Sequence, residues 1–565
     1  MTFHLVVWTV IGGQLMNTIE TKWPPHLCGN VVDKAKGWNL DAYLVALEGW
    51  RRGLDLGWHT KDHENIKQME TWFVDEPGRL FSLSNDSKTH FFFRTRGDKV
   101  TNEAVIQGSN KLTTKSLLLE NNVPTPVGGN FNIQLKDDII NYAHKIKYPV
   151  VIKPVDGSFG RGVFSNILND TELETAINSL REVYNETDII IEKYIKGNEY
   201  RIYVVDNKVV AAINRVPANI VGDGVHSIEQ LISHKNEQRA LNPRLYSCLI
   251  KVDTYLHSFL NKMGYKIFDI PDKEAVIYLN NKSNISLGGD SIDVLDELPR
   301  GIKQIAVNGL RSVPGLKHGA VDLIIDENDE NPDQAGYIIE LNPTAQIGSL
   351  VYPMHGYGRD VPSAIIDYYF PETKIKKHCN RRINFDFDAS IAPLLKQTAN
   401  TVTVRRNVNS DTLTYEFLIK LYEIDQQNLI DRALKRIALH YDISGITEYT
   451  SQNELIMKVA INKDIMESFE LDLKALGNSH HFEVLSKREY LQPIKQGFEV
   501  KDAKRFYIDN LRNKKTQINV ALKEKQKLEK RYQQMLSSNS WKITTPLRKV
   551  TGLIKGFKKE DKSGL

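Results

Sequence analysis

Two lysines and a glycine-rich loop have the residue types and the order that phosphate binding requires. Lys111 begins a predicted helix, and Lys153 ends the strand-like run VVIK directly before Pro154 and the loop DGSFGRG at 156–162. Backbone N–H groups of such a loop can approach a phosphate closely, and the two lysines supply positive charge on either side. An ordinary glycine-rich surface turn would look the same, and the chain has no Walker A loop. The loop residues that could contact a phosphate are Gly157, Ser158, Gly160 and Gly162.

A second group of polar residues lies at the end of the strand-like run IIEKYIKGNE. Glu192 is at its exit, followed by Lys193, Tyr194 and Ile195, and Glu199 comes seven positions after Glu192. The backbone of an exposed strand end can pair with the edge of an adenine ring, and a carboxylate one turn later can accept hydrogen bonds from ribose hydroxyls. The pattern therefore predicts a nucleotide site, although a polar hairpin end has the same composition.

Acidic and amide side chains on two apolar strand-like runs have the pattern of a metal site. Asp322 lies within GAVDLII, and Glu340 and Asn342 lie on YIIELNP. Residues i and i+2 of a strand share one face, so Glu340 and Asn342 point the same way. An unpaired carboxylate inside a strand as apolar as that of Asp322 would be expensive to bury. Each residue alone would more often be a surface or capping group, but the three oxygen ligands together favour Mg2+ or Mn2+, and not zinc.

Taken in order, these residues resemble the pattern of the ATP-grasp family: an early lysine, VVIKP, a glycine loop, EKYIKGNE, a single aspartate and then ExN. The resemblance covers roughly residues 105–370. The stretch EKYIKGNE is similar to that of D-alanyl-D-alanine ligases. The segments EYRIYVV, INRVPANIVGDGVHSIEQLI, NISLGGDSIDV and GAVDLII are similar to the ATP-grasp region of cyanophycin synthetases and bifunctional glutathione synthetases.

The resemblance implies an ATP-dependent ligase, with Mg2+ or Mn2+, that couples a small-molecule or peptide-like carboxylate to an amine. An acyl phosphate and ADP would form first, and the amine would then displace phosphate. By this resemblance the loop residues above would bind ATP together with Lys111, Lys153, Glu192, Lys193, Tyr194, Ile195 and Glu199. The metal ligands would be Asp322, Glu340 and Asn342, and the residues that face the acyl phosphate or substrate carboxylate would be Arg201 and Arg215.

Two departures from the family pattern are visible. A cyanophycin synthetase continues into a Mur-ligase-type domain with its own P-loop, which this sequence does not contain, and Asn110 stands where many family members carry an aspartate before the first lysine. Two other functions stay open. One is a kinase-like member that releases an acyl or guanidino phosphate, and the other is a scaffold that binds nucleotide through a degenerate site and recruits polysaccharide enzymes. The substrates themselves cannot be read from the sequence.

The composition is that of a soluble globular protein with several domains. The 565 residues are three to four times the roughly 150 of an ordinary domain, and 41% are hydrophobic and 25% charged. No run of about 18 apolar residues occurs, so no membrane-spanning helix is predicted, and no nucleic-acid-binding module is visible.

The three cysteines, Cys28, Cys248 and Cys379, are far apart in the sequence. This spacing fits a reducing cytoplasm, and it supports neither a disulfide framework nor a zinc site. Whether the chain forms a homo-oligomer stays open.

We expect an α/β and α+β multidomain chain in which an ATP-grasp fold is followed by a ferredoxin-like βαββαβ domain and a charged helix. We expect translation to begin at Met16, because the preceding residues lack the features of a targeting peptide. We also expect a linker at Pro393 and the polar stretch KQTANTVT. The expected domains are a small α/β domain at 16–104, the ATP-grasp domain at 105–375, the ferredoxin-like domain at 410–490, the charged helix at 500–537 and a basic amphipathic tail at 538–565.

The ferredoxin-like segment resembles acylphosphatases in its order of elements. Its first loop, YEIDQQNLIDRAL, has the acidic Glu423 and Asp425 where anion-binding glycines would belong, and the stretch from Thr447 to Tyr449 offers no asparagine. We therefore expect a catalytically inactive binding domain.

The end of the chain, SNSWKITTPLRKVTGLIKGF, resembles the C-terminal ending of glycosyltransferases and other enzymes of bacterial surface-polysaccharide pathways. From Trp541 onward, seven Lys or Arg residues stand against Glu560 and Asp561. Apolar residues such as Leu547 and Ile554 recur there at helical spacing, which predicts a basic amphipathic helix at the inner face of a membrane. A frayed soluble helix is the alternative.

Overall fold

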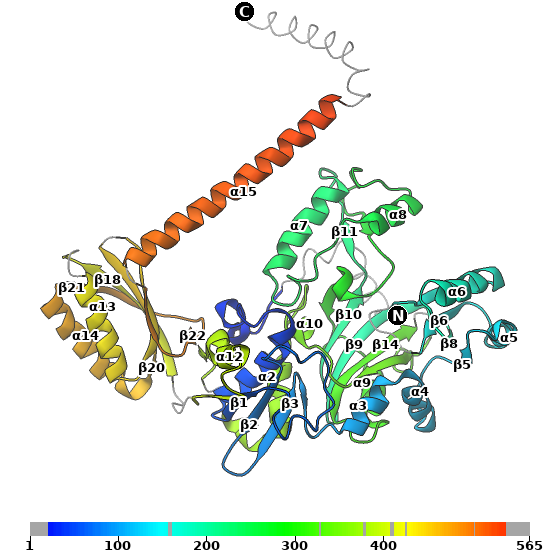
Figure 1. The fold of residues 1–565 in the computed structure, drawn as a ribbon, viewed down its shortest axis with the longest axis horizontal. Helices are drawn as coiled ribbons and strands as arrows, with labels where there is room; N and C mark the ends of the chain where they lie inside the picture. Colours follow the sequence, from blue (N-terminus) through cyan, green and yellow to red (C-terminus); the bar gives the residue numbers. More distant parts are fainter. Residues whose placement is uncertain are drawn as a thin grey trace, which may run out of the picture. The chain divides into compact units, whose positions relative to one another are not determined.

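The computed structural model describes residues 21–155, 161–326, 329–376, 380–406, 412–423, 427–451, 453–501 and 503–537. The backbone divides into two compact units (Figure 1). The first consists of Met1–Thr414, Ala460–Ile465 and Tyr490–Gly497, and the second of Tyr415–Val459, Met466–Glu489 and Phe498–Leu565. The expectations for a start at Met16 and for the tail at 538–565 lie outside the described residues.

A five-stranded sheet, whose core contains a cluster of aromatic side chains among aliphatic ones, forms the N-terminal part of the first unit. Its strands, in spatial order, are Thr401–Val404 (β17), Asp55–His59 (β1), Leu80–Ser84 (β2), Thr89–Phe93 (β3) and Arg96–Gly97 (β4). The helices in the same core are Leu40–Arg51 (α2), Val361–Tyr369 (α11) and Phe387–Leu395 (α12). Every residue of α2 is buried, and its charged side chains Asp41, Glu48 and Arg51 all have hydrogen-bond partners, which a helix enclosed on all sides requires.

The strand β17 corrects the prediction of a linker. Pro393 lies inside α12, and β17 pairs antiparallel with β1 from Leu56↔Val404 to His59↔Thr401. The linker was predicted from the polar composition of this stretch. That composition includes the alternation Thr-Val-Thr-Val, whose β-branched side chains favour extended backbone. The N-terminal sheet is therefore completed by residues that lie about 340 positions after β1 in sequence.

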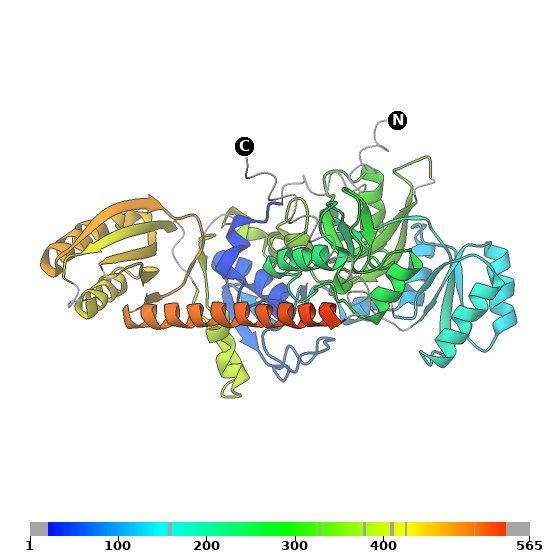
Figure 2. The same cartoon turned by 90° about the horizontal axis from the view of Figure 1, so that it is seen from above.

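A four-stranded sheet carries the glycine-loop segment. Its spatial order is Gly128–Asn132 (β5), Asp188–Lys193 (β8), Val150–Pro154 (β6) and Phe164–Ile167 (β7), and the helices Lys136–Ile146 (α5) and Asp170–Glu182 (α6) lie together against it (Figures 1 and 2). Val150, Ile152, Ile189 and Ile191 pack into the core that these helices share. Because side chains alternate along a strand, Lys153 and Glu192 project from the opposite face.

A second five-stranded sheet forms the centre of the first unit. Its spatial order is Asp290–Asp293 (β13), Lys208–Val216 (β10), Gly197–Val205 (β9), His318–Asp326 (β14) and Gly336–Asn342 (β15), with every pairing antiparallel. One face packs its apolar residues, including Ile202 and Val321, on the helices Asn102–Ser109 (α3), Lys111–Glu120 (α4) and Arg300–Arg311 (α9). The residues between these apolar positions therefore project from the other face.

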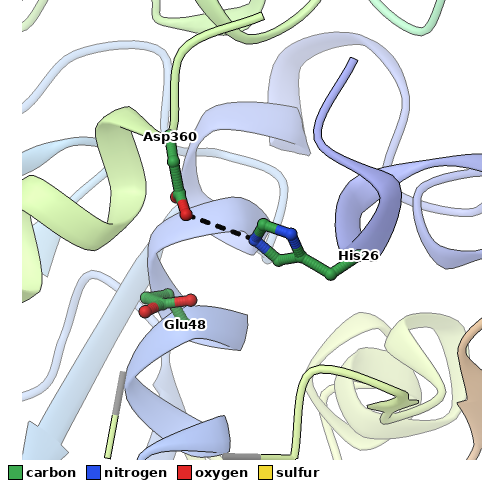
Figure 3. Close-up of side chains that lie close together, drawn as sticks. All are labelled: His26, Glu48 and Asp360. Atoms are coloured by element: carbon green, nitrogen blue, oxygen red, sulfur yellow. Dashed lines mark ion pairs between the residues drawn. The ribbon is translucent and has the colours of Figure 1, made fainter. Parts of the chain in front are cut away.

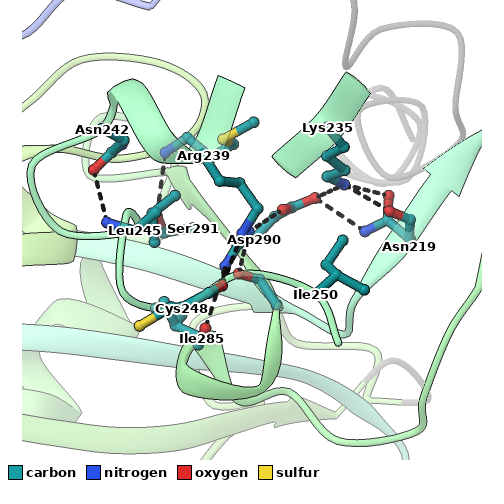
Figure 4. A network of polar contacts seen from close by, with 12 residues as sticks. Asn219, Lys235, Arg239, Asn242, Leu245, Cys248, Ile250, Ile285, Asp290 and Ser291 are labelled. Carbon is teal, nitrogen blue, oxygen red and sulfur yellow. Dashed lines mark hydrogen bonds and ion pairs between the residues drawn. The ribbon is translucent and has the colours of Figure 1, made fainter. Parts of the chain in front are cut away.

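A small lobe is inserted between β10 and β13. It consists of the strands Asn219–Val221 (β11) and Val276–Tyr278 (β12), the helices Ile228–Leu241 (α7) and Thr254–Lys262 (α8), and the short turn Ile285–Leu287. A buried polar network joins the lobe to β13 (Figure 4). Asp290 is fully buried and accepts hydrogen bonds from Arg239 Nη1 at 3.1 Å, Lys235 Nζ at 2.5 Å and Asn219 Nδ2 at 3.0 Å. Arg239 also donates to the Cys248 carbonyl at 2.7 Å.

We expect Arg239→Met to destabilise the first unit by about 3–5 kcal/mol, because removing one partner of a buried ion pair leaves the other charge and several carbonyl groups unpaired. Equilibrium urea denaturation at pH 7, followed by tryptophan fluorescence, measures the change. The exposed neighbour Gln238 offers a control, since Gln238→Ala removes no buried contact. Equal denaturation midpoints for Arg239→Met and Gln238→Ala would contradict the assignment.

The second unit contains a strand-helix-strand-strand-helix-strand order followed by a long helix. These elements are Thr412–Leu421 (β18), Gln427–His440 (α13), Ser444–Tyr449 (β19), Glu454–Asn462 (β20), Met466–His480 (α14), Phe482–Glu489 (β21), Phe498–Lys501 (β23) and Ala503–Ser537 (α15). The strand order is β21-β18-β20-β19-β23. On α15, Leu511, Ile518, Leu522 and Leu528 are exposed. None of the helices in the described ranges has the length and apolarity that crossing a bilayer requires.

The remaining elements are short. They are the 3-10 turns Pro25–Leu27, Gly29–Val31, Gly37–Asn39, Pro371–Lys376 and Lys463–Ile465, the helix Gly348–Val351 (α10), and the parallel strands Ile383–Asn384 (β16) and Ile494–Lys495 (β22).

Candidate active site

Four charged side chains meet on the open face of the central sheet. The pairing of β14 with β9 places Asp322 opposite Arg201, and the pairing of β9 with β10 places Glu199 opposite Arg215. Asp322 is buried and accepts two hydrogen bonds from Arg201, Nε to Oδ1 and Nη2 to Oδ2, both at 2.8 Å. Arg215 donates to Asp322 Oδ2 at 3.1 Å and forms an ion pair with Glu199. Two guanidinium groups are thus shared between two carboxylates.

The two arginines decide the ionisation of Asp322. Burial alone would raise the pKa of this carboxyl group, but the charges of Arg201 and Arg215 outweigh burial and hold the pKa well below its ordinary value. Asp322 is therefore ionised at neutral pH. Nε of Arg215 is buried and has no hydrogen-bond partner within the described part of the chain, so this guanidinium has a donor that a ligand oxygen can use.

Glu340 and Asn342 lie beside Asp322 on β15. The strand register pairs Asp322 with Glu340 and Ala320 with Asn342, and Nδ2 of Asn342 donates to Asp322 Oδ2 at 3.2 Å. Glu340 is exposed, and its pKa is raised, first by the protein atoms that reduce the hydration of its carboxyl group and then by the negative charge of Asp322. Two carboxylates that repel each other, with an amide oxygen beside them, form the donor set that a hard divalent cation prefers. The residues therefore fit Mg2+ or Mn2+.

A buried carboxylate between two lysines marks the open face of the four-stranded sheet. Glu192 Oε2 accepts from Lys153 Nζ, and Oε1 accepts from Lys115 Nζ, both at 2.6 Å. Burial would raise the pKa of Glu192, but the two ammonium groups outweigh it and hold this pKa below its ordinary value. Sequence reasoning missed Lys115. The one sequence feature that could have indicated Lys115 is its position four residues after Lys111, because this spacing places both lysines on one side of α4.

Lys111 lies beside the start of the glycine loop. It is the first residue of α4, and its Nζ donates to the carbonyl of Val155 at 3.2 Å. The Asn110 side chain accepts from the N–H groups of Leu112 at 3.0 Å and Thr113 at 2.9 Å. Because Asn and Asp are equally good at this capping position, the departure from the family pattern at Asn110 preserves the local structure.

The glycine loop is described only at its end. Gly162 has a φ of 69°, and a Cβ on it would lie 2.9 Å from Pro154 Cγ, so a larger residue would be strained there. Gly157, Ser158 and Gly160 lie outside the described residues.

The residues at the exit of β8 do not all converge on one point. Lys193 Nζ donates to the carbonyls of Lys147 at 2.8 Å and Tyr148 at 3.0 Å, so its charge is used in the turn before β6. Tyr194 and Ile195 are half-buried. The structure therefore brings Lys153 together with Glu192, and Glu199 together with the Arg201 and Asp322 group, but it does not bring the Lys193 ammonium group to either.

A separate set of potential metal ligands lies in the N-terminal part of the unit (Figure 3). Side-chain ligand atoms of His26, Glu48 and Asp360 lie within 4.8 Å of one another, and His26 Nε2 is 3.3 Å from Asp360 Oδ2. However, Glu48 accepts from Arg52 Nε at 2.8 Å, and Asp360 accepts from Arg381 Nη2 at 2.7 Å. These ion pairs account for the cluster, and none of its residues belongs to the sequence pattern that predicts the metal site, so we assign it a structural role.

Comparison with known proteins shows what part of the chain is similar to. Residues 108–243 match the family of RimK-like ATP-grasp domains. This part of the chain is therefore similar to RimK-like ATP-grasp domains. The match contains Lys111, Lys153, Glu192 and Arg201, whereas Asp322, Glu340 and Asn342 follow it in sequence.

Two curated relatives extend the likeness. The glutathione biosynthesis bifunctional protein GshAB of Enterococcus faecalis is 32% identical over 315 residues, which are 54% of this chain and 41% of that protein. The cyanophycin synthetase of Trichormus variabilis is 32% identical over 354 residues, 61% of this chain and 39% of that protein. The chain thus spans about two fifths of the length of these relatives. A solved bifunctional glutathione synthetase from Pasteurella multocida is 27% identical with a TM-score of 0.42, covering 52% of this chain and 41% of that one.

We expect Glu192→Gln to lower the unfolding free energy at pH 7 by about 3 kcal/mol, because Lys153 and Lys115 would lose their shared counter-charge. The folded-state pKa of Glu192 lies below its ordinary value. The ionised Glu192 therefore contributes its full share of the folding free energy above the ordinary glutamate pKa of about 4.3. This share is lost as the pH falls through the lower folded-state pKa. Urea denaturation at pH 7 and at pH 3.5 checks both points. The exposed Glu182→Gln is the control. A difference from wild type that did not shrink at the lower pH would contradict the ion-pair interpretation.

Proposed function

We propose that this chain is an ATP- and Mg2+-dependent ligase that joins a carboxylate to an amine. One observation carries the proposal. Two arginines, Arg201 and Arg215, lie on the same sheet face as the potential metal ligands Asp322, Glu340 and Asn342. The four-stranded sheet, within the part of the chain that matches RimK-like ATP-grasp domains, carries Lys153 and Glu192. The first set suits a metal and an anionic substrate, and the second suits a nucleotide.

The proposed reaction needs no nucleophile from the protein. The substrate carboxylate attacks the γ-phosphorus of ATP, ADP leaves, and an acyl phosphate forms; the amine then attacks the acyl carbon and phosphate leaves. Lys111 and Lys153 would bind the phosphates, and Arg201 and Arg215 would hold the carboxylate and then the acyl phosphate through charge-assisted hydrogen bonds. A bound Mg2+, held by Asp322, Glu340 and Asn342, would neutralise charge that develops on the phosphoryl oxygens.

The relatives support the same reaction class. Their names describe glutathione biosynthesis and cyanophycin synthesis, and we extend from them only the joining of a carboxylate to an amine. A kinase-like reaction that ends at the acyl phosphate is the alternative. An ADP-release screen with amino acids, singly and in pairs, separates the two, because only the ligase needs an amine for steady turnover. The comparisons give no support for a role in polysaccharide synthesis.

We expect Glu340→Gln to reduce substrate-dependent ADP release by about 10²-fold or more, because one metal ligand and its charge would be lost from the phosphoryl-transfer transition state. A coupled ADP assay at saturating Mg-ATP measures the rate, and circular dichroism shows that the variant is folded. The exposed Glu330→Gln is the matched control. Turnover of Glu340→Gln equal to that of Glu330→Gln would remove the metal assignment.

For the C-terminal segments we propose accessory roles. The βαββαβ part of the second unit would be a binding domain that does not hydrolyse acyl phosphates, since the acidic Glu423 and Asp425 in its first loop repel a phosphate group. The segment from Trp541 would contact an anionic membrane surface through its lysines and apolar residues, as its sequence predicts.

We expect the full chain to sediment with anionic vesicles at low salt and a truncation that ends at Ser540 to stay in the supernatant. Near such a surface each Lys or Arg contributes about 1 kcal/mol to the binding free energy, and salt screens this electrostatic contribution. Vesicle co-sedimentation at several ionic strengths measures how much of the binding is electrostatic. Failure of the full chain to sediment at low salt would exclude the membrane role.

A further inference from the structure

The long helix α15 carries apolar side chains that are open to solvent. The helix extends over Ala503–Ser537 and contains neither glycine nor proline (Figure 1). Its residues Leu511, Ile518, Leu528 and Tyr532 are between 55% and 68% exposed. Helices in proteins take most of their stability from packing of an apolar side against a neighbour. A helix of this length with exposed apolar residues therefore needs a packing partner.

These residues follow the seven-residue repeat of a coiled coil. The first and fourth positions of the repeat, called a and d, form the seam between two helices. If Leu511 is at position a, Ile518 and Tyr532 are at later a positions and Leu528 is at a d position. The spacing therefore predicts one seam along the helix from residue 511 to residue 532.

Two lysines in the seam decide the direction of the partner helix. Lys514 is at a d position and Lys525 at an a position, and both are exposed. In a parallel pair of identical helices in register, each lysine would face its own copy and be repelled. In an antiparallel pair, an a residue of one helix faces a d residue of the other. A centre near Lys523 then places Lys525 opposite Ala521 and Lys514 opposite Tyr532, so neither lysine faces a like charge.

The same antiparallel alignment matches the other residues of two copies. Ile518 lies opposite Leu528, so one apolar layer forms on each side of the centre. Beside the seam, Lys515 lies opposite Glu529, and symmetry repeats this pair of opposite charges. The two Glu529 side chains are 63% exposed and can reach a partner helix. Glu524 meets its own copy at the centre, but it is followed directly by a lysine in each helix.

We propose that α15 pairs with α15 of a second copy of this chain as an antiparallel two-stranded coiled coil. Charge complementarity selects the second copy, because the seam and flanking charges of α15 fit those of an identical helix in the antiparallel direction and repel them in the parallel one. The seam from Leu511 to Tyr532 is about 33 Å long at the rise of 1.5 Å per residue. The chain is thus a dimer that is held together through its second unit.

Sedimentation equilibrium of the full chain in the micromolar range tests the proposal. We expect a mass twice the 64.5 kDa of one chain. Ile518→Glu should raise the dissociation constant by about 100-fold or more, because a carboxylate would enter an apolar layer. Val520→Glu is the matched control, since Val520 is two positions away, is 51% exposed and lies outside the seam. It should leave the dissociation constant unchanged, and circular dichroism shows that both variants are folded.

An exchange of charges tests the direction of the helices. Lys515→Glu and Glu529→Lys should each raise the dissociation constant by about fivefold or more, because an attractive pair becomes repulsive in two places. The double variant restores opposite charges between the chains and should return to within about twofold of the wild type. Glu529 also lies 3.8 Å from Lys525 of its own helix. That contact stays lost in the double variant, so the recovery measures the contact between chains.

Three results would overturn the proposal. The first is a full chain that stays monomeric throughout the micromolar range. The second is an equal dissociation constant for Ile518→Glu and Val520→Glu, which would place the interface elsewhere. The third is a double variant as weak as its parents, or a Glu529→Lys variant that binds more tightly than the wild type. Tighter binding would indicate the parallel direction, in which Glu529 faces Glu524 of the other helix.

Discussion

The buried carboxylate of Asp322 is the constraint on which the arrangement of the central sheet depends. An aspartate between Val321 and Leu323 would be costly to bury alone. The neighbouring strands remove this cost by placing Arg201 and Arg215 on the same face. A slip of β9 by one residue would turn Arg201 into the apolar core beneath α9 and leave Asp322 unpaired. The ion pairs therefore help to fix the register that brings the residues of the proposed site together.

The same alternation of side chains organises the four-stranded sheet and the central sheet. Each sheet buries apolar residues of one face under helices and carries charged residues on the other. On the central sheet that second face is shared, because Tyr203 and Ala320 pack into the N-terminal core beside the charged group. On the four-stranded sheet both oxygens of Glu192 are already occupied, one by Lys153 and the other by Lys115. On the central sheet the arginines occupy the oxygens of Asp322. A substrate or cation that binds there must exchange with these internal partners, and does not enter an empty site.

Local sequence pattern predicted the strands and the polar residues on them, but not how those residues pair. The runs VVIKP and GAVDLII predict strands because they contain contiguous apolar residues, several of them β-branched. The partnership of Asp322 with Arg201 could not be predicted from these runs, because it depends on the register between strands that are 121 residues apart. Lys115 could not be distinguished from other helical lysines until Glu192 was placed beside it. The strand β17 was missed because its partner β1 lies far away in the sequence and its own composition is polar.

That last pairing sets an order for the synthesis of the protein. Thr401 pairs with His59 across 342 residues, and at a translation rate of about 5–20 residues per second the outer edge of β1 waits roughly 20–70 s for its partner. During this time the nascent chain presents an unpaired strand edge, which is a site for association with other chains. The first sheet to be synthesised is thus completed only after all strands of the four-stranded sheet and of the central sheet have been made.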